Sequence, residues 1–518
     1  MTHIGRIVGT RVMEIRFRTR SSENLQVGEL LVVDEENNGI RYFIRVTDIE
    51  YGADADRDDW LIREAGGMLR RDFSGEIQNF DELQNRLYRI GVCMPLGYFS
   101  ENSFKKTKSI PSHFSKVRRA NEADYGFLRR FLGDIEVGKL RSGDKVLDFP
   151  VGISGLAFPH HIGIFATTGM GKSNLMKDLA LSCMKLRRYG FLIFDPHGEY
   201  YDGGEVGKKG LKHANMQDAL EVFSCRQLDG PHSTLRLSAR EIEISDLQNL
   251  YEFSQAQIEC LQAAQFVYGE NWLQELNTRD VERICRDMEN KFHEGTISVI
   301  KRRLESIFRF NLITSDPKLS ITKHIIECLH NAKVVLVDTS NLYEAEELLV
   351  STVISRAVFE RHKLLYGNKE EFERIPPILI AMEEAQRVLS QARGSIFAQI
   401  AREGRKFKVG LCAISQQPKL IDPEIISQFN TLFILGLADK RDREILRSSA
   451  KQDISQVENE IQMLMPGEAI IASPFTPFAI PVKIHLYEDF ISQSTHNEAG
   501  TKSNKENMAK EHFEFRFY

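Results

Sequence analysis

One short segment of the sequence has the residue types and spacing needed to hold a phosphate. The apolar run IGIF (162–165) is followed by ATTGMGKS (166–173) and then by apolar residues at helical spacing. Glycines let backbone N–H groups turn toward phosphate oxygens, a lysine supplies charge, and a serine supplies a ligand for Mg²⁺. Ala166 replaces the first glycine of the strict motif but is small, so a ligand-free turn is the weaker alternative. We predict that ATP and Mg²⁺ bind here through Thr167, Thr168, Gly169, Met170, Gly171, Lys172, Ser173 and Asn174.

Paired carboxylates follow a second apolar run. Residues ILIAM (378–382) precede Glu383 and Glu384. In isolation such a pair is more often a solvated helix start, but a strand end downstream of a phosphate loop favours catalysis. We predict that Glu384 polarises the attacking water, and that Glu383 approaches Mg²⁺ through a water and shares the metal site with Ser173.

Further candidates surround the strand predicted over 409–414. Gln416 follows it and could hydrogen-bond the γ-phosphate or the attacking water. Arg402 and Arg405 precede it, where an arginine can stabilise transition-state charge in a neighbouring subunit's site, although basic residues at a helix end also complement the helix dipole. In FDPHGEYYD (194–202), Asp195, His197 and Glu199 could adjust the Mg²⁺ and water network or could simply hydrogen-bond within a loop.

Composition sets broad limits on the class of protein. The chain has 518 residues, 42% hydrophobic and 27% charged, with a formal net charge of −5. These values predict a folded protein of several domains, or of one enlarged α/β core, with no uniformly basic surface. No apolar run approaches the roughly 20 residues of a membrane-spanning helix, so we expect a cytoplasmic protein without a membrane partner. The seven cysteines are scattered without a CxxC pair, which argues against disulfides and a zinc site.

The order of patterns predicts an α/β protein. Short β-rich runs over residues 1–100 indicate a small barrel, and the basic stretch within 101–145 indicates a linker. Alternating apolar runs and helical segments over 146–490 predict a parallel sheet with crossover helices, interrupted by a helical insertion at 240–330. The polar residues 491–518 are expected to form a flexible tail.

Six segments resemble the HerA family of hexameric DNA-translocating ATPases, which belongs to the larger FtsK/HerA group: ATTGMGKSN, FDPHGEYYD, MEEAQRVLS, IAREGRKFKVGL, SQQPK and PGEAII. The likeness implies a RecA-like P-loop ATPase core, a HAS-barrel and an inserted helical subdomain. Two positions depart from the family: Gln386 stands where many members have histidine, and His160-His161 precedes the first core strand where an Arg-His pair can occur.

The resemblance also implies a function. It implies an ATP-driven translocase or helicase on double-stranded DNA that works as a homohexamer, in DNA repair beside a NurA-like nuclease or in antiviral defence beside an effector such as a sirtuin-like NADase. The alternatives are a nucleotide-binding ring scaffold that regulates an effector and a protein-pumping ATPase of the secretion type. Our candidates for DNA contact are basic loop residues near the core: Lys208, Lys209, Lys212 and Arg393.

Overall fold

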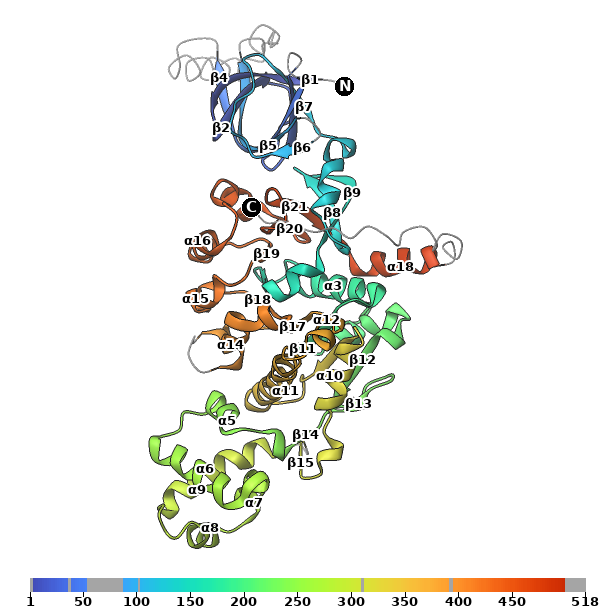
Figure 1. Cartoon of the computed structure of the whole chain (residues 1–518). Coiled ribbons are helices and arrows are strands. Elements are labelled where there is room, and N and C mark those ends of the chain that lie inside the picture. Colours follow the sequence, from blue (N-terminus) through green and yellow to red (C-terminus); the bar gives the residue numbers. More distant parts are fainter. Residues whose placement is uncertain are drawn as a thin grey trace, which may run out of the picture.

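A computed structural model describes residues 3–35, 39–53, 87–100, 103–308, 312–390 and 395–498. Three parts follow one another along its length (Figure 1): a barrel at the N-terminal end, a large sheet flanked by helices, and a group of helices at the far end. Among the described residues, no helix combines the length and apolar character needed to cross a membrane.

The N-terminal strands close into an antiparallel barrel. Its strand order is β2-β1-β7-β3-β4-β5, closed by pairing of β2 with β5, and β6 adds to β5 outside the ring. Alternate residues such as Leu31 and Val33 are fully buried in its interior, as the period of a strand requires. The strands are β1 (His3–Arg11), β2 (Glu14–Arg20), β3 (Leu30–Glu35), β4 (Ile40–Ala53), β5 (Leu87–Ser100), β6 (Ser103–Lys105) and β7 (Lys116–Arg119).

The stretch expected to be a basic linker is instead part of this barrel, and that expectation is wrong. β7 lies between β1 and β3. Arg118 is buried, and its guanidinium contacts the carboxylates of Asp34 at 2.6 Å and Asp124 at 2.7 Å. Asp34 and Asp124, which lie outside the basic stretch, therefore neutralise the charge of Arg118 and allow this side chain to be buried.

Within the described residues, the central sheet has twelve strands in the order β13-β12-β16-β11-β17-β18-β10-β19-β20-β21-β8-β9. The first eight are parallel, as expected for a P-loop core, but β20, β21, β8 and β9 extend the sheet in antiparallel fashion. The sheet is thus mixed rather than purely parallel. Its strands are β8 (Ile135–Ser142), β9 (Lys145–Ile153), β10 (Ile162–Phe165), β11 (Gly190–Asp195), β12 (Leu220–Ser224), β13 (Ser233–Thr234), β16 (Val334–Asp338), β17 (Ile378–Met382), β18 (Val409–Ser415), β19 (Thr431–Ile434), β20 (Glu468–Ala472) and β21 (Ile480–Ile484).

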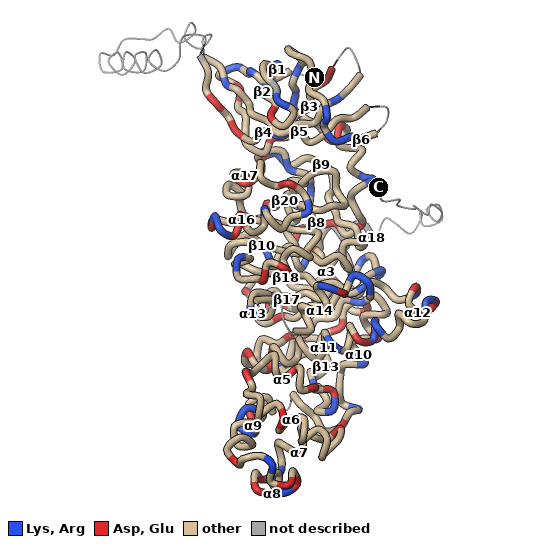
Figure 2. The backbone as a smooth tube through the Cα atoms, turned by 60° about the vertical axis from the view of Figure 1, so that its left-hand side comes forward, with Lys and Arg blue, Asp and Glu red and all other residues tan. Residues whose placement is uncertain are grey.

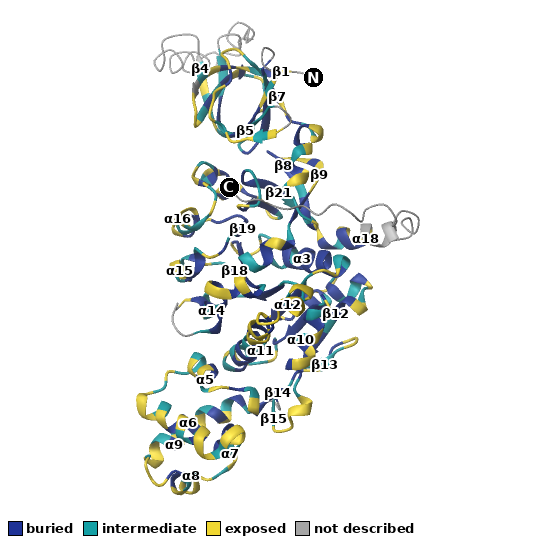
Figure 3. Ribbon diagram, viewed as in Figure 1, coloured by how far each residue is buried: buried dark blue, intermediate teal, exposed yellow. Residues whose placement is uncertain are grey.

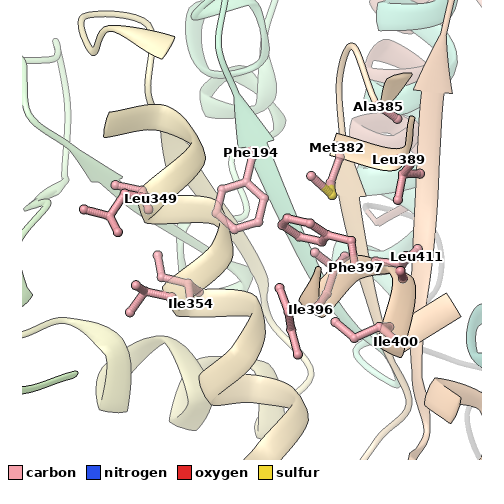
Figure 4. Packing of buried hydrophobic residues seen from close by; sticks show 14 of the residues in the cluster. Phe194, Leu349, Ile354, Met382, Ala385, Leu389, Ile396, Phe397, Ile400 and Leu411 are labelled. Atoms are coloured by element: carbon pink, nitrogen blue, oxygen red, sulfur yellow. The ribbon is translucent and has the colours of Figure 1, made fainter. Parts of the chain in front are cut away.

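Two apolar layers bury the faces of this sheet because successive strand residues point to opposite sides. In β17, Ile378 and Ile380 join the layer formed with α11 and α14, whereas Leu379 joins the layer formed with α3. Figure 4 shows Met382, at the end of β17, in the first of these layers. The helices are α3 (Lys172–Leu186), α4 (Glu199–Asp202), α10 (Thr322–His330), α11 (Glu344–Leu365), α12 (Lys369–Arg374), α13 (Gln386–Leu389), α14 (Ile396–Glu403), α15 (Pro423–Ile426), α16 (Lys440–Ser449), α17 (Glu458–Met463) and α18 (Tyr487–Glu498).

Short 3₁₀ helices connect many of these elements. They are η1 (Glu122–Arg130), η2 (Gly155–His160), η3 (Leu211–Ala214), η4 (Gln217–Ala219), η5 (Ala239–Glu241), η6 (Gly269–Asn271), η7 (Pro317–Leu319), η8 (Gly404–Phe407), η9 (Pro418–Leu420) and η10 (Ser455–Val457).

The helical insertion begins and ends at the small parallel pair β14 (Leu237–Ser238) and β15 (Ile313–Thr314). Its outer faces are largely exposed, whereas the strands of the central sheet are buried (Figure 3). The insertion is shorter than expected, because α10 packs on the sheet rather than with it. Its helices are α5 (Ile244–Leu250), α6 (Gln255–Tyr268), α7 (Trp272–Thr278), α8 (Val281–Asp287) and α9 (Glu294–Ile307).

A buried charge triad joins the barrel to the core. Glu460 of α17 forms an ion pair with Arg45 of β4 at 2.6 Å and accepts a hydrogen bond from Arg141 of β8, and all three side chains are buried. Burial alone would raise the pKa of Glu460, but the two guanidiniums outweigh it and hold this pKa below its usual value. Arg45 also donates to the carbonyl of Ala479 at 3.1 Å, so the barrel is attached to the antiparallel side of the sheet.

Candidate active site

The carboxyl ends of four adjacent parallel strands bring the predicted site residues to one edge of the sheet. In the registers of β10 with β18, β18 with β17, and β17 with β11, Phe165 lies beside Ser415 and Met382 beside Ala413 and Phe194. The segments that follow these strands, from Ala166, Glu383, Gln416 and Asp195, therefore meet at that edge. This edge is where open α/β sheets bind their ligands.

The loop between β10 and α3 has the shape of a phosphate cradle. Gly169 (φ 79°) and Gly171 (φ 103°) adopt left-handed conformations that a side chain would strain. The loop is fixed at both ends: Thr167 N–H donates to Gly436 O at 3.0 Å, and Met170 O accepts from Gly467 N–H at 3.1 Å. Between these anchors the loop is exposed, so its backbone is open to a ligand.

Lys172 is held in place for an anion. Its ammonium group donates to the Ala166 carbonyl at 3.3 Å, so the side chain curls back over the loop. Burial lowers the pKa of Lys172, while the nearby carboxylates of Glu383, Glu384 and Glu199 act in the opposite direction. A partly desolvated cation at the base of an open loop fits the phosphate chain of a nucleotide.

Glu384 is oriented by two amide side chains. Its backbone has a φ of 48°, a left-handed conformation that costs a non-glycine residue about 1 to 3 kcal/mol. Gln416 donates an N–H to its Oε1 at 3.2 Å, and Gln386 donates to its Oε2. Ser415 in turn donates to the Gln386 carbonyl at 2.6 Å, which fixes the direction of that amide.

The same network reaches the phosphate loop. The hydroxyl of Thr168 donates to the amide oxygen of Gln416, so loop, glutamine and Glu384 form one hydrogen-bonded chain. The sequence predicted Gln416 and Glu384 but missed Gln386 and Ser415 as supporting residues. The position of Gln386, two residues after the catalytic candidate, was the available signal.

Glu383 turns the other way, toward the FDPHGEYYD segment. The buried hydroxyl of Tyr200 donates to its Oε1, and His197 Nε2 lies 4.0 Å from its Oε2. Burial raises the pKa of Glu383, and the Tyr200 hydrogen bond acts against that rise. The two adjacent glutamates thus have different surroundings, as different roles require. Tyr200 was not foreseen as a site residue.

Asp195 holds the backbone of its own loop. Its carboxylate accepts N–H groups from Gly198 at 2.7 Å and Tyr200 at 2.9 Å, with longer bonds from His197 and Glu199. Burial raises the pKa of Asp195 to about 6, although these N–H groups lower it. Asp195 thus hydrogen-bonds within its own loop, which was the second of the two roles considered for it. This bonding places His197 and Tyr200 beside Glu383.

The two residues after Lys172 differ in their surroundings. Ser173 is half-buried in the first turn of α3, beside the loop. The side chain of Asn174, expected to bind nucleotide, instead donates to His485 O at 2.6 Å and accepts from Tyr487 N–H at 3.0 Å. Its amide thus anchors the segment before α18 and is occupied there.

Arg402 and Arg405 do not lie at this edge. Both are exposed and precede β18, whereas Gln416 follows it, and a seven-residue strand spans about 20 Å. Neither can reach the phosphate loop of its own chain. Nearby, His161 is buried with its Nδ1 accepting from Leu411 N–H at 3.0 Å, and burial lowers its pKa to about 4.

The candidate DNA-contacting residues lie in two places. Lys208 is exposed and pairs with Glu205 at 2.7 Å, Lys209 is half-buried, and Lys212 lies 3.6 Å from Asp229. All three follow α4, near the site edge. Arg393 falls outside the described residues.

Comparisons with known proteins agree with this geometry. Residues 135–358 match the family model described as the helicase HerA central domain. The chain is 26% identical over 433 residues to the DNA double-strand break repair helicase HerA of Saccharolobus solfataricus, covering 79% of this chain and 81% of that protein. The chain is therefore similar to HerA helicases over most of its length. A probable helicase of Methanocaldococcus jannaschii is 28% identical, covering 63% of each protein.

Solved structures with similar folds were also found for this chain. The conjugative coupling protein TrwB is 13% identical, with a TM-score of 0.49, over 71% of this chain and 92% of that one. VirB4 of Thermoanaerobacter pseudethanolicus is 16% identical, with a TM-score of 0.46, over 68% of this chain and 96% of that one.

Proposed function

We propose that this protein is a HerA-type, Mg²⁺-dependent ATPase that translocates double-stranded DNA in the cytoplasm as a homohexamer. The observation that carries the proposal is the series of hydrogen bonds from Thr168 through Gln416 to Glu384. These bonds join an open phosphate loop to an oriented carboxylate. Two of the similar proteins are named DNA double-strand break repair helicases. Their names support DNA as the molecule that this protein moves when it hydrolyses ATP.

The residues divide the work by position. The backbone N–H groups of the 167–171 loop and the ammonium of Lys172 bind the phosphates. Ser173 and, through water, Glu383 would hold Mg²⁺, which neutralises charge on the phosphate oxygens. Glu384 takes the proton of the attacking water, with Gln386 and Gln416 fixing its two oxygens.

Because Arg402 and Arg405 lie far from the loop of their own chain, we propose that they act on a neighbouring subunit's nucleotide. Replacing Arg405 by alanine is expected to lower ATP turnover about 10³-fold while nucleotide affinity stays unchanged, since such an arginine acts on transition-state charge. Steady-state ATPase assays and nucleotide titrations measure the two effects.

A mixing experiment tests the action across subunits. Arg405→Ala and Lys172→Ala subunits, each inactive alone, should regain partial turnover when combined, because one interface then holds an intact loop and an intact arginine. Arg286→Ala, an exposed arginine on α8, serves as the control and should retain full turnover. Normal hydrolysis by isolated Arg405→Ala monomers would contradict the assignment.

DNA binding requires a local concentration of positive charge on a chain of net charge −5. Lys and Arg positions are interspersed with Asp and Glu positions over the described chain (Figure 2), so we expect the contact to come from particular loops. We propose the loop with Lys208 and Lys209. The Lys209 backbone is bonded to Lys177 and Glu488, so the loop keeps its anchors when the side chains are changed.

Duplex DNA is expected to stimulate ATP turnover, and the stimulation should fall between low and moderate salt because phosphate contacts release counterions. Reversing Lys208 and Lys209 to glutamate should reduce it. Lys291→Glu, an exposed lysine that also pairs with a glutamate, is the matched control. Absence of stimulation at every salt concentration would overturn the translocase and favour the alternative of a nucleotide-binding scaffold.

The barrel is proposed as the docking part of the molecule. We assign to it a partner such as a NurA-like nuclease or a defence effector of the sirtuin-like NADase type, because its described residues bring together no nucleophile, base and orienting group. Co-purification of the full chain with each class of enzyme distinguishes the two.

A further inference from the structure

A mixed set of side chains gathers at the end of the central sheet away from the barrel. Glu221 of β12 lies beside His324 and Cys328 of α10, and one donor atom from each residue lies within 4.8 Å of the others. We propose that Glu221, His324 and Cys328 bind a divalent transition-metal ion of the zinc type. The proposal is independent of the nucleotide site and of the function assigned to it.

The distances between the donor atoms are close to those of a tetrahedral zinc site. Glu221 Oε1 lies 3.5 Å from His324 Nε2, and Cys328 Sγ lies 3.7 Å from His324 Nε2 and 3.9 Å from Glu221 Oε2. Bond lengths of about 2.0 to 2.3 Å at tetrahedral angles place donor atoms about 3.3 to 3.6 Å apart. Side-chain shifts of a few tenths of an ångström therefore suffice.

Local structure places these three side chains side by side before any ion arrives. His324 and Cys328 are four residues apart on α10, and that spacing puts them on one face of a helix. The imidazole of His324 packs edge-on against Phe223 of β12, with ring centroids 5.7 Å apart. Cys328 is buried and Glu221 half-buried, whereas His324 is exposed and leaves an entry path from solvent.

The chemistry of the set selects the ion. Thiolate, imidazole and carboxylate together suit zinc better than calcium or magnesium, which prefer oxygen ligands. A thiolate and a carboxylate also neutralise a divalent charge, and a water would complete the fourth position. The bound ion would clamp α10, the helix through which the chain returns from the helical insertion, onto β12.

Lys333 competes with a metal ion for Glu221. Its ammonium group lies 3.1 Å from Glu221 Oε2, the oxygen nearer Cys328, while Oε1 faces His324. If the cluster is only this ion pair, no cation will bind with a cysteine ligand. The two possibilities therefore differ in a spectroscopic signal that is specific to sulfur.

The test uses the full chain, stripped with a chelator and titrated with Co²⁺ without nucleotide. The expected result is one equivalent of Co²⁺ with tetrahedral visible bands and a near-ultraviolet sulfur-to-cobalt charge-transfer band, all removed by Zn²⁺. Cys328→Ser should abolish the charge-transfer band. Glu221→Gln and His324→Asn should weaken binding by about tenfold or more, the range found even for groups that only support metal ligands.

Controls separate the site from general effects. Cys225→Ser removes a half-buried thiol just after the same strand and should leave the band intact. His324→Asn changes an exposed side chain, so it keeps the test valid if Cys328→Ser fails to fold. Absence of the charge-transfer band in the unaltered protein, or its full persistence in Cys328→Ser, would overturn the proposal, and neither result bears on ATP hydrolysis.

Discussion

Replacing Lys172 by alanine is expected to lower ATP turnover by at least about 10² to 10³-fold, the loss typical of removing one preorganised charge from a reaction centre. The ammonium group is already positioned over the loop by the Ala166 carbonyl, and the protein supplies no second cation there among the described contacts. Nucleotide affinity should fall as well, because Lys172 contacts the phosphates in the ground state. Steady-state ATPase assays and a fluorescent-nucleotide titration measure both.

A matched lysine tests whether the loss is local. Lys145→Ala removes an exposed lysine on β9 and should leave turnover and affinity unchanged. Thermal unfolding of both variants checks that the fold is intact. Turnover in Lys172→Ala equal to that of the unaltered protein would remove the loop from the catalytic site.

Glu384→Gln should lose turnover by about 10² to 10⁴-fold, the usual contribution of a general base. Nucleotide should still bind, because the carboxamide has nearly the same shape and Lys172 and the loop are untouched. The variant cannot accept a proton, and its N–H₂ group meets one of the two glutamine amides that now donate to the carboxylate. Rapid filtration and a phosphate-release assay measure the two effects. The expected result is ATP that stays bound to the variant, with little phosphate released.

Glu347→Gln provides the comparison for that variant. Glu347 lines the same cleft as Glu383 and Glu384, and burial raises the pKa of its carboxyl group. It has no contact with the Thr168–Gln416 chain among the described bonds, so its variant should hydrolyse ATP normally. If both variants are equally inactive, loss of any carboxylate in this cleft stops turnover. The assignment of Glu384 as the general base would then be wrong.

Much of the site could be predicted because its signals are local. The phosphate loop, Glu383, Glu384 and Gln416 each follow an apolar run, and the parallel sheet carries all such ends to one edge. The supporting residues were harder to find. Tyr200 acts through a hydrogen bond to Glu383, 183 positions further along the chain, and Gln386 through a hydrogen bond to Glu384, two positions before it. The side chain of Asn174 donates to the carbonyl of His485, 311 positions away.

The fold departs from prediction where long-range partners decide. Lys116–Arg119 reads as a solvated basic run, yet it forms a central barrel strand because Asp34 and Asp124 neutralise Arg118. The four antiparallel strands come from two distant parts of the chain, and β8 pairs with β21 across more than 300 residues. Neither pairing leaves a pattern in the local sequence.

The triad of Arg45, Glu460 and Arg141 limits how this architecture can evolve. Removing one partner of a buried ion pair costs about 3 to 5 kcal/mol, because the remaining charge is left without compensation. The barrel is therefore not a freely exchangeable module, although it has its own apolar interior. A lineage that acquires a different barrel must keep an arginine where Arg45 stands or replace Glu460 in the core at the same time. Recombination at this junction is thus restricted by a single carboxylate in the other part of the molecule.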